Sequence, residues 1–558
     1  MSNESPQEDR FQSFVSILIA TVTIIAATTA FLQAFAGNQA AEANRQAQEL
    51  SLQATTKRVT GAVQFSYDWQ GAFQTWREID LQIIHAEQEG DTLAIERYTE
   101  LRDRVASLSP LLGPPYYETS VNWPDSARYE ADLYIVDSTR LTEQFTAQAE
   151  LGNAWDDIAN AFVIQLTLLA VTLSLYGLSN SLKSWVRWLF VFVGLSMVVF
   201  NLGWMAYLLI APLPELPQAA IEAYAQGVGM AYQARDQEAI QYFDQALSIQ
   251  PEYANALYER ANSYFYLGDY TNAAQGYEAA LDAGRDDTSL GWNLGWTYYL
   301  LGQFDDAVSI NQQALTRDPT LIGLRMNQGL VLLAAGRFGN AEVEYTRALE
   351  EAARQVSASR AAGQEPPSSL WFYLDAGAAD LESLLDTLNG TPKAWTQSPP
   401  ASVISTDLSN LQNDALGYIR GIKEASASLE YTGQLPGLSS NAMVPSMQAG
   451  EKIDDDAGNF LRYDITESFP NGTNDVVILF DYSGMQTGQS EIWKVYVNGF
   501  EDPSLRVVSD WKLEDTGSAV KQITFAYSNV FVFTPGEYVV ELYVDYHLMQ
   551  SVKFFVEE

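Results

Sequence analysis

Three uncharged apolar runs constrain this chain more than any other feature of its sequence. They cover Phe14–Gly37, Ile158–Ser179 and Trp188–Pro212. Each has about the 20 residues that a helix needs to cross the hydrocarbon core of a bilayer. Uncharged runs of this length favour membrane spans over buried helices of a soluble domain. Because helical sequence continues from the first run through Ala40–Leu52, we expect an uncleaved signal anchor there rather than a signal peptide.

The few Lys and Arg residues beside these runs predict the orientation of the chain. Arg10 precedes the first run, and Lys183 and Arg187 lie in the short turn between the second and the third. The segments Gly37–Asn44 and Leu213–Tyr224 carry neither residue type. Positively charged flanks stay in the cytoplasm, so we expect a multi-pass protein of the cytoplasmic membrane with its N-terminus inside. The segment between the first two spans, and everything after the third, then lies outside.

The spans themselves indicate anchoring rather than transport. They lack the ionisable side chains that line proton and ion paths. Small residues recur along one face of the first run, where they let helices approach closely in lipid; they are Ser16, Ala20, Thr23, Ala27 and Ala30. Such a face is compatible with a homo- or hetero-oligomer that forms through the spans.

The segment between the first two spans, residues 38–157, is predicted to be a helical hairpin or bundle. Its apolar residues recur at helical spacing, with breaks at Gly90-Asp91 and at Pro110–Tyr117. A helical domain between two spans resembles the ligand-sensing domains of bacterial receptors in architecture. No kinase, cyclase or coiled-coil output segment accompanies it, so a sensor of this kind would signal through a separate partner.

A period of 34 residues runs through the middle of the chain. Several classes of position repeat in phase, among them two alanine series, a small-residue series and a turn-glycine series. They are Ala239, Ala273, Ala307 and Ala341; Ala246, Ala280, Ala314 and Ala348; Gly227, Ala261, Gly295 and Gly329; and Gly268, Gly302 and Gly336. The first repeat has Ala234 in place of the turn glycine, and the second has Arg285 in place of a closing proline. We expect neither departure to break the fold.

This pattern resembles the tetratricopeptide repeat (TPR) family over about residues 220–353. The resemblance implies an α-solenoid of helix pairs with a concave groove that binds a protein or a peptide. It also implies that small residues lie where two helices touch. A linker, SASRAAGQEPPSS, should follow the fourth repeat, and capping helices or a degenerate repeat should follow the linker.

The register of the resemblance projects ten residues onto the inner face of the groove: Tyr224, Tyr232, Tyr258, Asn262, Phe265, Tyr266, Trp292, Trp296, Tyr299 and Met326. Large aromatic side chains at some of these positions are also explained by packing. Trp296 is less easily explained in that way, and Trp and Tyr often anchor interfaces. No basic residue is among the ten, which disfavours a clamp for a peptide carboxylate. An extended, apolar or Pro-containing peptide, or a neighbouring protein surface, fits better.

The C-terminal part of the chain, residues 436–558, alternates with a period of two. Strands are predicted at FLRYDI, DVVILFDY, EIWKVYVNG, LRVVSDW, AVKQITFAY, YVVELYVDY and MQSVKFFV. The final hairpin resembles that of immunoglobulin-like domains in bacterial surface proteins, which implies a β-sandwich. Asp454-Asp455-Asp456 could contribute oxygen ligands for calcium, but no full ligand pattern surrounds the three residues, and a solvated acidic loop is the preferred interpretation.

The amino-acid composition excludes several classes of function. The formal net charge is −39, from 31 Lys and Arg against 70 Asp and Glu, which disfavours nucleic acid as a partner. The absence of cysteine and the presence of only two histidines remove most metal sites and nucleophiles. No cofactor, metal or catalytic residue is expected, and we do not expect an enzyme. A hydrolase that uses paired carboxylates is the weakest alternative, because abundant Asp and Glu do not exclude it.

Together these features predict a multidomain chain with three helical membrane spans, a helical outer domain, a TPR solenoid and an all-β immunoglobulin-like sandwich. The expected parts are residues 1–37 (tail and first span), 38–157 (outer helices), 158–212 (second and third spans), 213–353 (repeats), 354–435 (linker and capping helices) and 436–558 (sandwich). The predicted function is a membrane-anchored extracytoplasmic scaffold that binds protein or peptide partners in the TPR groove. We expect a prokaryotic origin from this architecture and from the cysteine-free outer domains.

Overall fold

The chain divides into two compact units. The computed structural model describes residues 6–118, 123–182, 185–392, 397–404, 407–437, 441–454, 460–513, 516–524 and 533–557. Unit 1 comprises Met1–Asp269 with Asp282–Gly284, and unit 2 comprises Tyr270–Leu281 with Arg285–Glu558. Lys183, Asp455, Asp456 and the end of the strand predicted over AVKQITFAY lie outside the described residues.

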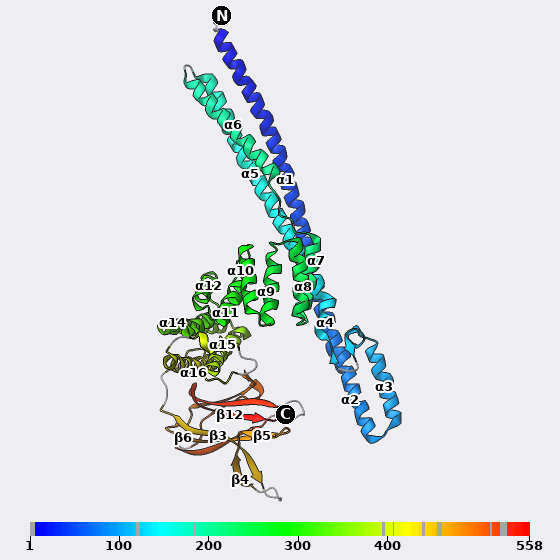
Figure 1. Cartoon of the computed structure of the whole chain (residues 1–558), viewed down its shortest axis with the longest axis vertical. Coiled ribbons are helices and arrows are strands. Elements are labelled where there is room, and N and C mark those ends of the chain that lie inside the picture. Colours follow the sequence, from blue (N-terminus) through cyan, green and yellow to red (C-terminus); the bar gives the residue numbers. More distant parts are fainter. Residues whose placement is uncertain are drawn as a thin grey trace. The chain divides into compact units, whose positions relative to one another are not determined.

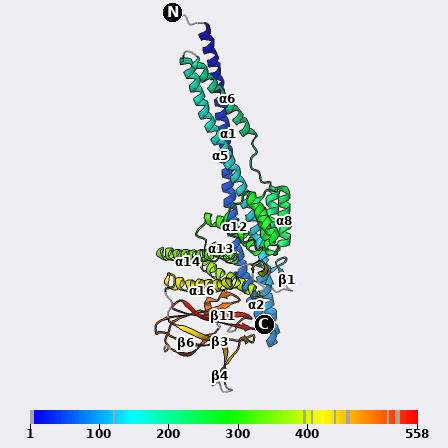
Figure 2. The same ribbon diagram turned by 60° about the vertical axis from the view of Figure 1, so that its left-hand side comes forward.

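Three long helices of unit 1 contain the three apolar runs. They are α1 (Pro6–Ser66), α5 (Val136–Ser181) and α6 (Val186–Ile210), and they lie side by side in both views (Figure 1, Figure 2). All three are long and apolar enough to cross a membrane. Their shared core consists of Phe11, Val15, Val22, Leu169, Tyr176, Val191 and Val198. Many other apolar side chains of the same helices are exposed.

The outer segment of unit 1 is helical, with the break at Gly90-Asp91 that the sequence predicts. Gly90 has the left-handed φ of 72° that ends a helix, and the Asp91 carboxylate caps the next helix. The remaining elements are η1 (Tyr67–Phe73), α2 (Gln74–Glu89), α3 (Thr92–Ala106), η2 (Pro110–Leu112), β1 (Tyr117–Glu118), β2 (Trp123–Pro124), α4 (Ser126–Glu130) and η3 (Ala131–Ile135). Two of these, η1 and η3, are π-helical, a detail that apolar periodicity does not predict.

The repeats form helices with turns between them. Unit 1 holds α7 (Gln218–Tyr232), α8 (Asp236–Ile249) and α9 (Ala254–Tyr266), and unit 2 holds α11 (Thr288–Leu300), α12 (Phe304–Arg317), α13 (Ile322–Ala334) and α14 (Phe338–Ala361). Most of α10 (Tyr270–Asp282) also belongs to unit 2. Both alanine series are completely buried. Within each unit, the repeat helices therefore lie at the positions along the chain that the 34-residue period predicts.

The small-residue series lies where paired helices touch, as the resemblance implies. A Cβ added at Gly227 would lie 2.5 Å from the ring of Phe243, and one added at Gly329 would lie 2.8 Å from the ring of Tyr345. Ala234 adopts the left-handed conformation of the turn glycine it replaces, with a φ of 54°. A Cβ in that conformation costs about 1 kcal/mol, too little to prevent α8 from starting at Asp236.

The predicted linker is partly helical. Helix α14 continues through Ala361, so the linker expected from Ser357 onward begins later than its composition predicts. Val356 is buried, and the Arg360 guanidinium donates to the backbone carbonyls of Leu429 and Glu430 at 3.1 and 2.7 Å. These contacts tie the last turns of α14 to α16 (Leu408–Thr432). The other capping helix is α15 (Ser368–Leu388), and the short η4 (Ala401–Val403) lies between α15 and α16.

Two sheets face each other across one core in the C-terminal part of unit 2. One sheet has the order β10-β6-β3-β4, and the other has the order β5-β12-β11-β7-β8, with β9 paired to β7. The strands are β3 (Met443–Asp454), β4 (Phe460–Ile465), β5 (Ser468–Phe469), β6 (Asp475–Ser483), β7 (Ser490–Val497), β8 (Phe500–Glu501), β9 (Val507–Asp510), β10 (Gly517–Thr524), β11 (Gly536–Val544) and β12 (His547–Val556), with η5 (Pro503–Leu505) before β9. Both sheets contribute to the core, including Ile478, Trp493, Val540 and Phe554. The region is a β-sandwich, and its immunoglobulin-like character stays a prediction.

Candidate functional site

The ten residues projected onto the groove are shared between the two units. Tyr224, Tyr232, Tyr258, Asn262, Phe265 and Tyr266 lie in unit 1, and Trp292, Trp296, Tyr299 and Met326 lie in unit 2. Each group is therefore described by itself.

Most of the group in unit 1 is engaged within that unit. Tyr224 and Tyr258 are buried, and Tyr224 packs on the ring of Tyr253 at a centroid distance of 5.1 Å. The Asn262 amide donates to Glu259 at 2.9 Å. The rings of Phe265 and Tyr266 meet edge to face at 5.9 Å, and Tyr266 is 76% exposed. Tyr266 is thus the most accessible aromatic residue of this group.

The first repeat contacts the helices that precede and contain the second apolar run. The Tyr232 hydroxyl donates to Glu130 of α4 at 2.8 Å, and the Tyr134 hydroxyl donates to the other oxygen of the same carboxylate at 2.5 Å. A Cβ added at Gly229 of α7 would lie 2.5 Å from Val136 of α5. Tyr232 therefore holds α7 to the outer segment in this structure, which was not predicted from the sequence.

Glu143 of α5 forms a second contact of this kind. Its carboxylate is 6% exposed and accepts a hydrogen bond from the Tyr253 hydroxyl at 2.7 Å and from the Asn255 amide at 3.0 Å. Tyr253 is buried, and burial together with the adjacent carboxylate raises its pKa. We call Glu143, Tyr253 and Asn255 the stalk contact. Because Glu143 is 110 residues from Tyr253 in the sequence, no local pattern reveals the stalk contact.

The four predicted residues of unit 2 come together with the capping helix α15. The Trp292 indole lies 5.5 Å from the ring of Tyr373, and its N–H lies 2.8 Å from the side-chain oxygen of Asn327 once that amide is oriented to satisfy both of its ends. Trp296 packs on Tyr299 at 5.0 Å. Met326 is buried against Gly377 of α15. We call Trp292, Trp296, Tyr299 and Tyr373 the aromatic face.

A segment of the chain itself lies against this aromatic face. Residues 397–404, the covering segment, have the sequence Gln-Ser-Pro-Pro-Ala-Ser-Val-Ile. The Trp296 indole N–H donates to the Gln397 side-chain oxygen at 3.2 Å. Ser398 lies near Tyr299, which is buried, and burial raises the pKa of the Tyr299 hydroxyl. Pro399 and Ile404 are buried.

The turn after α11 is shaped to receive the end of the covering segment. Gly302 has a φ of 75°, and a Cβ added there would lie 2.7 Å from Cγ2 of Val403. Glycine is therefore needed at this position both for the backbone conformation and for the close approach. The sequence suggests only the first reason, because Gly302 belongs to the turn-glycine series of the repeats.

A carboxylic acid lies close to the phenols of this region. Burial raises the pKa of Asp380, on α15, to about 7. Burial and the nearby Asp380 carboxylate both raise the pKa of Tyr299 and of Tyr345, and Tyr345 stacks on Tyr418 of α16 at 4.5 Å. The ionisation state of Asp380 therefore changes within the physiological pH range.

We predict that Asp380→Asn removes a pH dependence of stability. The native carboxyl holds its proton up to about pH 7, whereas an unfolded aspartate loses it near pH 4. Stability should consequently fall as pH rises between these values. The difference of about three between the two pKa values corresponds to about 4 kcal/mol, so at pH 8 the variant should be more stable than the parent by about that amount, and near pH 4 the two should be equal. Thermal unfolding of both proteins at the two pH values measures this, and a parent without the decline would contradict it.

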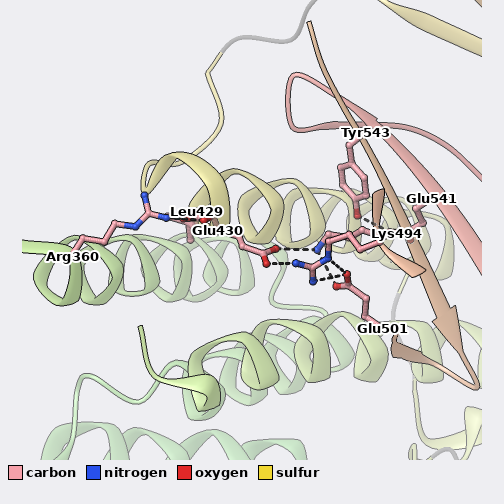
Figure 3. Close-up of polar contacts among 8 residues, drawn as sticks. Arg360, Leu429, Glu430, Lys494, Glu501, Glu541 and Tyr543 are labelled. Carbon is pink, nitrogen blue, oxygen red and sulfur yellow. Dashed lines mark hydrogen bonds and ion pairs between the residues drawn. The ribbon is translucent and has the colours of Figure 1, made fainter. Parts of the chain in front are cut away.

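The capping helix α16 is joined to the sandwich by a buried ionic network (Figure 3). Lys494 of β7 is 2% exposed, and its ammonium lies 3.1 Å from Glu501 and 3.8 Å from Glu430 of α16. Arg506 binds Glu501 at 2.5 Å and also pairs with Glu430. Figure 3 shows Glu430 of the helix and Lys494 and Glu501 of the strands pointing toward one another. The network makes the sandwich an integral part of unit 2.

A cavity of about 660 Å³ lies beside this network, between α15, α16 and the sheet. Its lining includes Asp375, Lys423, Tyr496 and Glu541. Burial lowers the pKa of Lys423, but Glu541 at 2.6 Å and Glu382 at 3.0 Å outweigh burial and raise it. Burial raises the pKa of Asp375 to about 6. Across the described ranges of the chain, no group of three or more His, Cys, Asp or Glu side chains is placed to hold a metal ion.

Comparisons with known proteins identify one of the repeats. The tetratricopeptide repeat model matches residues 292–321, which begin at Trp292 and include Trp296 and Tyr299. No curated protein matches the chain.

Three of the solved structures that are similar to this chain are the following. One is MamA from Desulfovibrio magneticus RS-1, at 21% identity and a TM-score of 0.23, covering 27% of this chain and 82% of that one. Another is YrrB, described as a TPR protein with an unusual peptide-binding site. It has 16% identity and a TM-score of 0.25, and the match covers 38% of this chain and 91% of that one. A third is the alkylpurine DNA glycosylase AlkC of Pseudomonas fluorescens. It has 10% identity and a TM-score of 0.22, and the match covers 61% of this chain and 92% of that one. All three TM-scores are low, and no conclusion is drawn from these structures.

Proposed function

We propose that this chain is a membrane-anchored extracytoplasmic scaffold whose repeats bind a protein or peptide partner. The aromatic face of unit 2 is the observation that carries the proposal. Three of its four residues lie in the segment that matches the tetratricopeptide repeat, and two of these, Trp292 and Trp296, are only partly buried. Partly exposed Trp and Tyr side chains gathered in one place are the usual anchors of protein interfaces.

The membrane anchor in this proposal consists of the apolar parts of α1, α5 and α6. Their length and composition suit a bilayer. The placement of Arg10, Lys183 and Arg187 supports a cytoplasmic N-terminus and a cytoplasmic turn between the second and third spans. The stalk contact joins the first repeats to α5, the helix that carries the second span. The anchor would thereby fix where the first repeats stand relative to the membrane.

The remaining projected residues belong to the same proposal. Tyr266 is the best placed to contact a partner in unit 1, because it is largely exposed. Tyr224, Tyr258 and Met326 are buried, so their contribution would be to support the binding surface from behind. No cofactor or catalytic residue enters this function.

We predict that Trp292→Ala combined with Trp296→Ala abolishes partner capture. Removing two anchoring indoles from an interface typically costs about 2 kcal/mol or more each, which lowers affinity by roughly a thousandfold in total. The full-length protein is solubilised in detergent, captured by a tag, and its bound proteins are quantified by mass spectrometry. The parent should retain a specific partner that the double variant loses.

Phe460→Ala combined with Phe500→Ala is the matched control for this experiment. Both phenylalanines are exposed on strands of the sandwich, so the control removes two aromatic side chains elsewhere in unit 2. It should capture the partner as the parent does. Equal recovery by the parent and the tryptophan variant, with both proteins folded, would contradict the proposed role of the aromatic face.

A further inference from the structure

We propose that the covering segment is an internal ligand of the aromatic face, and that the partner is an uncharged Pro-containing peptide segment that displaces it. The inference rests on the proposed function, because it names the class of partner that the same face would bind. The structure indicates which chemical groups the partner would present, because one of the chain's own segments lies against Trp296, Tyr299 and the turn at Gly302.

Three features of the covering segment define what the face recognises. An amide oxygen, from Gln397, accepts from the indole of Trp296. A proline, Pro399, is buried in the middle of the segment. An aliphatic pair follows, in which Val403 approaches the bare backbone of Gly302 and Ile404 is buried. The covering segment therefore places a hydrogen-bond acceptor on Trp296 and an aliphatic side chain on the turn at Gly302, with a buried proline between them.

The absence of charge is part of this recognition. The covering segment contains neither acidic nor basic residues, although 18% of the whole chain is charged. A carboxylate placed against the aromatic face would lose its hydration without gaining a cationic partner, which is unfavourable. Proline fits for a second reason, because it restricts the peptide before binding and so reduces the entropy lost on binding. Acidic peptides should consequently bind poorly.

The covering segment is held weakly enough to be displaced. Gln397, Pro400, Ala401, Ser402 and Val403 are exposed, and only Pro399 and Ile404 are buried. Segments with few buried apolar contacts open at low free-energy cost. It also belongs to a connection between two helices, so its release leaves α15 and α16 with the contacts that they make to each other and to the sandwich. An internal ligand of this kind raises the concentration of partner that is needed for binding.

The test uses the full-length protein and a synthetic peptide of the sequence Gln-Ser-Pro-Pro-Ala-Ser-Val-Ile with blocked ends and a fluorophore. In one variant, residues 397–404 are replaced by a Gly-Ser sequence of the same length. We expect the peptide to bind this variant and to bind the intact chain at least about tenfold more weakly. Trp296→Ala in the replaced variant should weaken binding by about tenfold or more. A peptide with Asp at the two proline positions should bind at least tenfold more weakly.

A second variant guards against misfolding of the first. The double variant Val403→Asp plus Ile404→Asp keeps the length of the covering segment and weakens the contacts of its end. This variant should bind the peptide more tightly than the intact chain does and more weakly than the Gly-Ser variant does. Absence of peptide binding to both variants, while their helix content and unfolding temperature match those of the intact chain, would overturn the inference. Equal binding to the intact chain and to both variants would overturn it as well. Partner capture by the intact chain does not depend on the peptide, so the proposed function can stand if this inference fails.

Discussion

Replacing Lys494 by alanine should lower the stability of unit 2 by about 3–5 kcal/mol. The ammonium of this residue is nearly inaccessible, and its position in β7 lies directly opposite Glu541 of β11. Removing it takes the positive charge away from between Glu501 and Glu430 and opens a cavity in the sheet. Breaking a buried ion pair from one side has this magnitude because the opposing carboxylate stays buried. In thermal unfolding, the transition of unit 2 should move down by roughly 10 °C.

Two further variants show whether charge, rather than volume, causes the loss. Lys494→Met combined with Glu501→Gln removes one charge of each sign while keeping the size of both side chains, and it should recover at least half of the loss. Lys553→Ala removes an exposed lysine that pairs with Glu537 at 3.4 Å, and it should change stability by about 0.5 kcal/mol or less. If Lys494→Ala were as mild as Lys553→Ala, the buried network would not stabilise the sandwich in the way described.

Replacing Glu143 by alanine should release the first repeats from α5, with a local loss of about 3 kcal/mol. The substitution leaves the Tyr253 hydroxyl and the Asn255 amide without the acceptor that they share. A buried donor that loses its partner costs about 1–3 kcal/mol. Hydrogen exchange of the full-length protein in detergent should therefore become faster in α7 and α9, by up to roughly a hundredfold. The apolar part of α5 should exchange at its original rate.

Glu143→Gln and Glu150→Ala are the controls for this prediction. The glutamine keeps one acceptor oxygen and should show a smaller effect than the alanine. Glu150 lies on the same helix and is exposed, so its removal should leave exchange in α7 and α9 nearly unchanged. Unchanged exchange in Glu143→Ala would show that the stalk contact does not hold the repeats.

The repeats and the apolar helices could be predicted because local patterns encode them. The alanines that recur every 34 residues are the completely buried ones, and the turn positions take a left-handed backbone even where Ala234 replaces glycine. In each case a small residue or a turn residue is required by a contact that recurs with the period of the structure.

Strand β3 shows where a period of two fails as a signal. Ala442, just before the strand, and Val444 are buried two residues apart, but the next buried residues are Met447 and Ala449, so the alternation slips by one residue. The pairing of β3 with β6 shifts register at the same place, around Pro445. A one-residue shift of register puts the following apolar side chains on the opposite phase of the alternation. The sequence of this segment therefore does not alternate regularly, and no strand was predicted there.

The contacts that place the candidate site could not be predicted, because they join distant segments. Gln397 meets Trp296 across 101 residues, and Glu143 meets Tyr253 across 110. The 34-residue period ends before α15. The repeat register therefore assigns no position to Tyr373 and could not predict its contact with Trp292. The sequence led us to expect an extended, apolar or Pro-containing peptide, or a neighbouring protein surface, in the groove. It did not show that the chain supplies such a segment itself.

We propose above all that the apolar helices hold the repeats and the sandwich outside the cytoplasmic membrane. The chain contains no cysteine, so single cysteines can be introduced at Glu252 in the repeats, at Asn471 in the sandwich and at Trp185 between the second and third spans. All three residues are exposed. In intact cells, or in spheroplasts where an outer membrane is present, a membrane-impermeant maleimide should label the first two cysteines. Trp185→Cys should be labelled only after permeabilisation. Labelling of Trp185→Cys alone before permeabilisation would contradict the account.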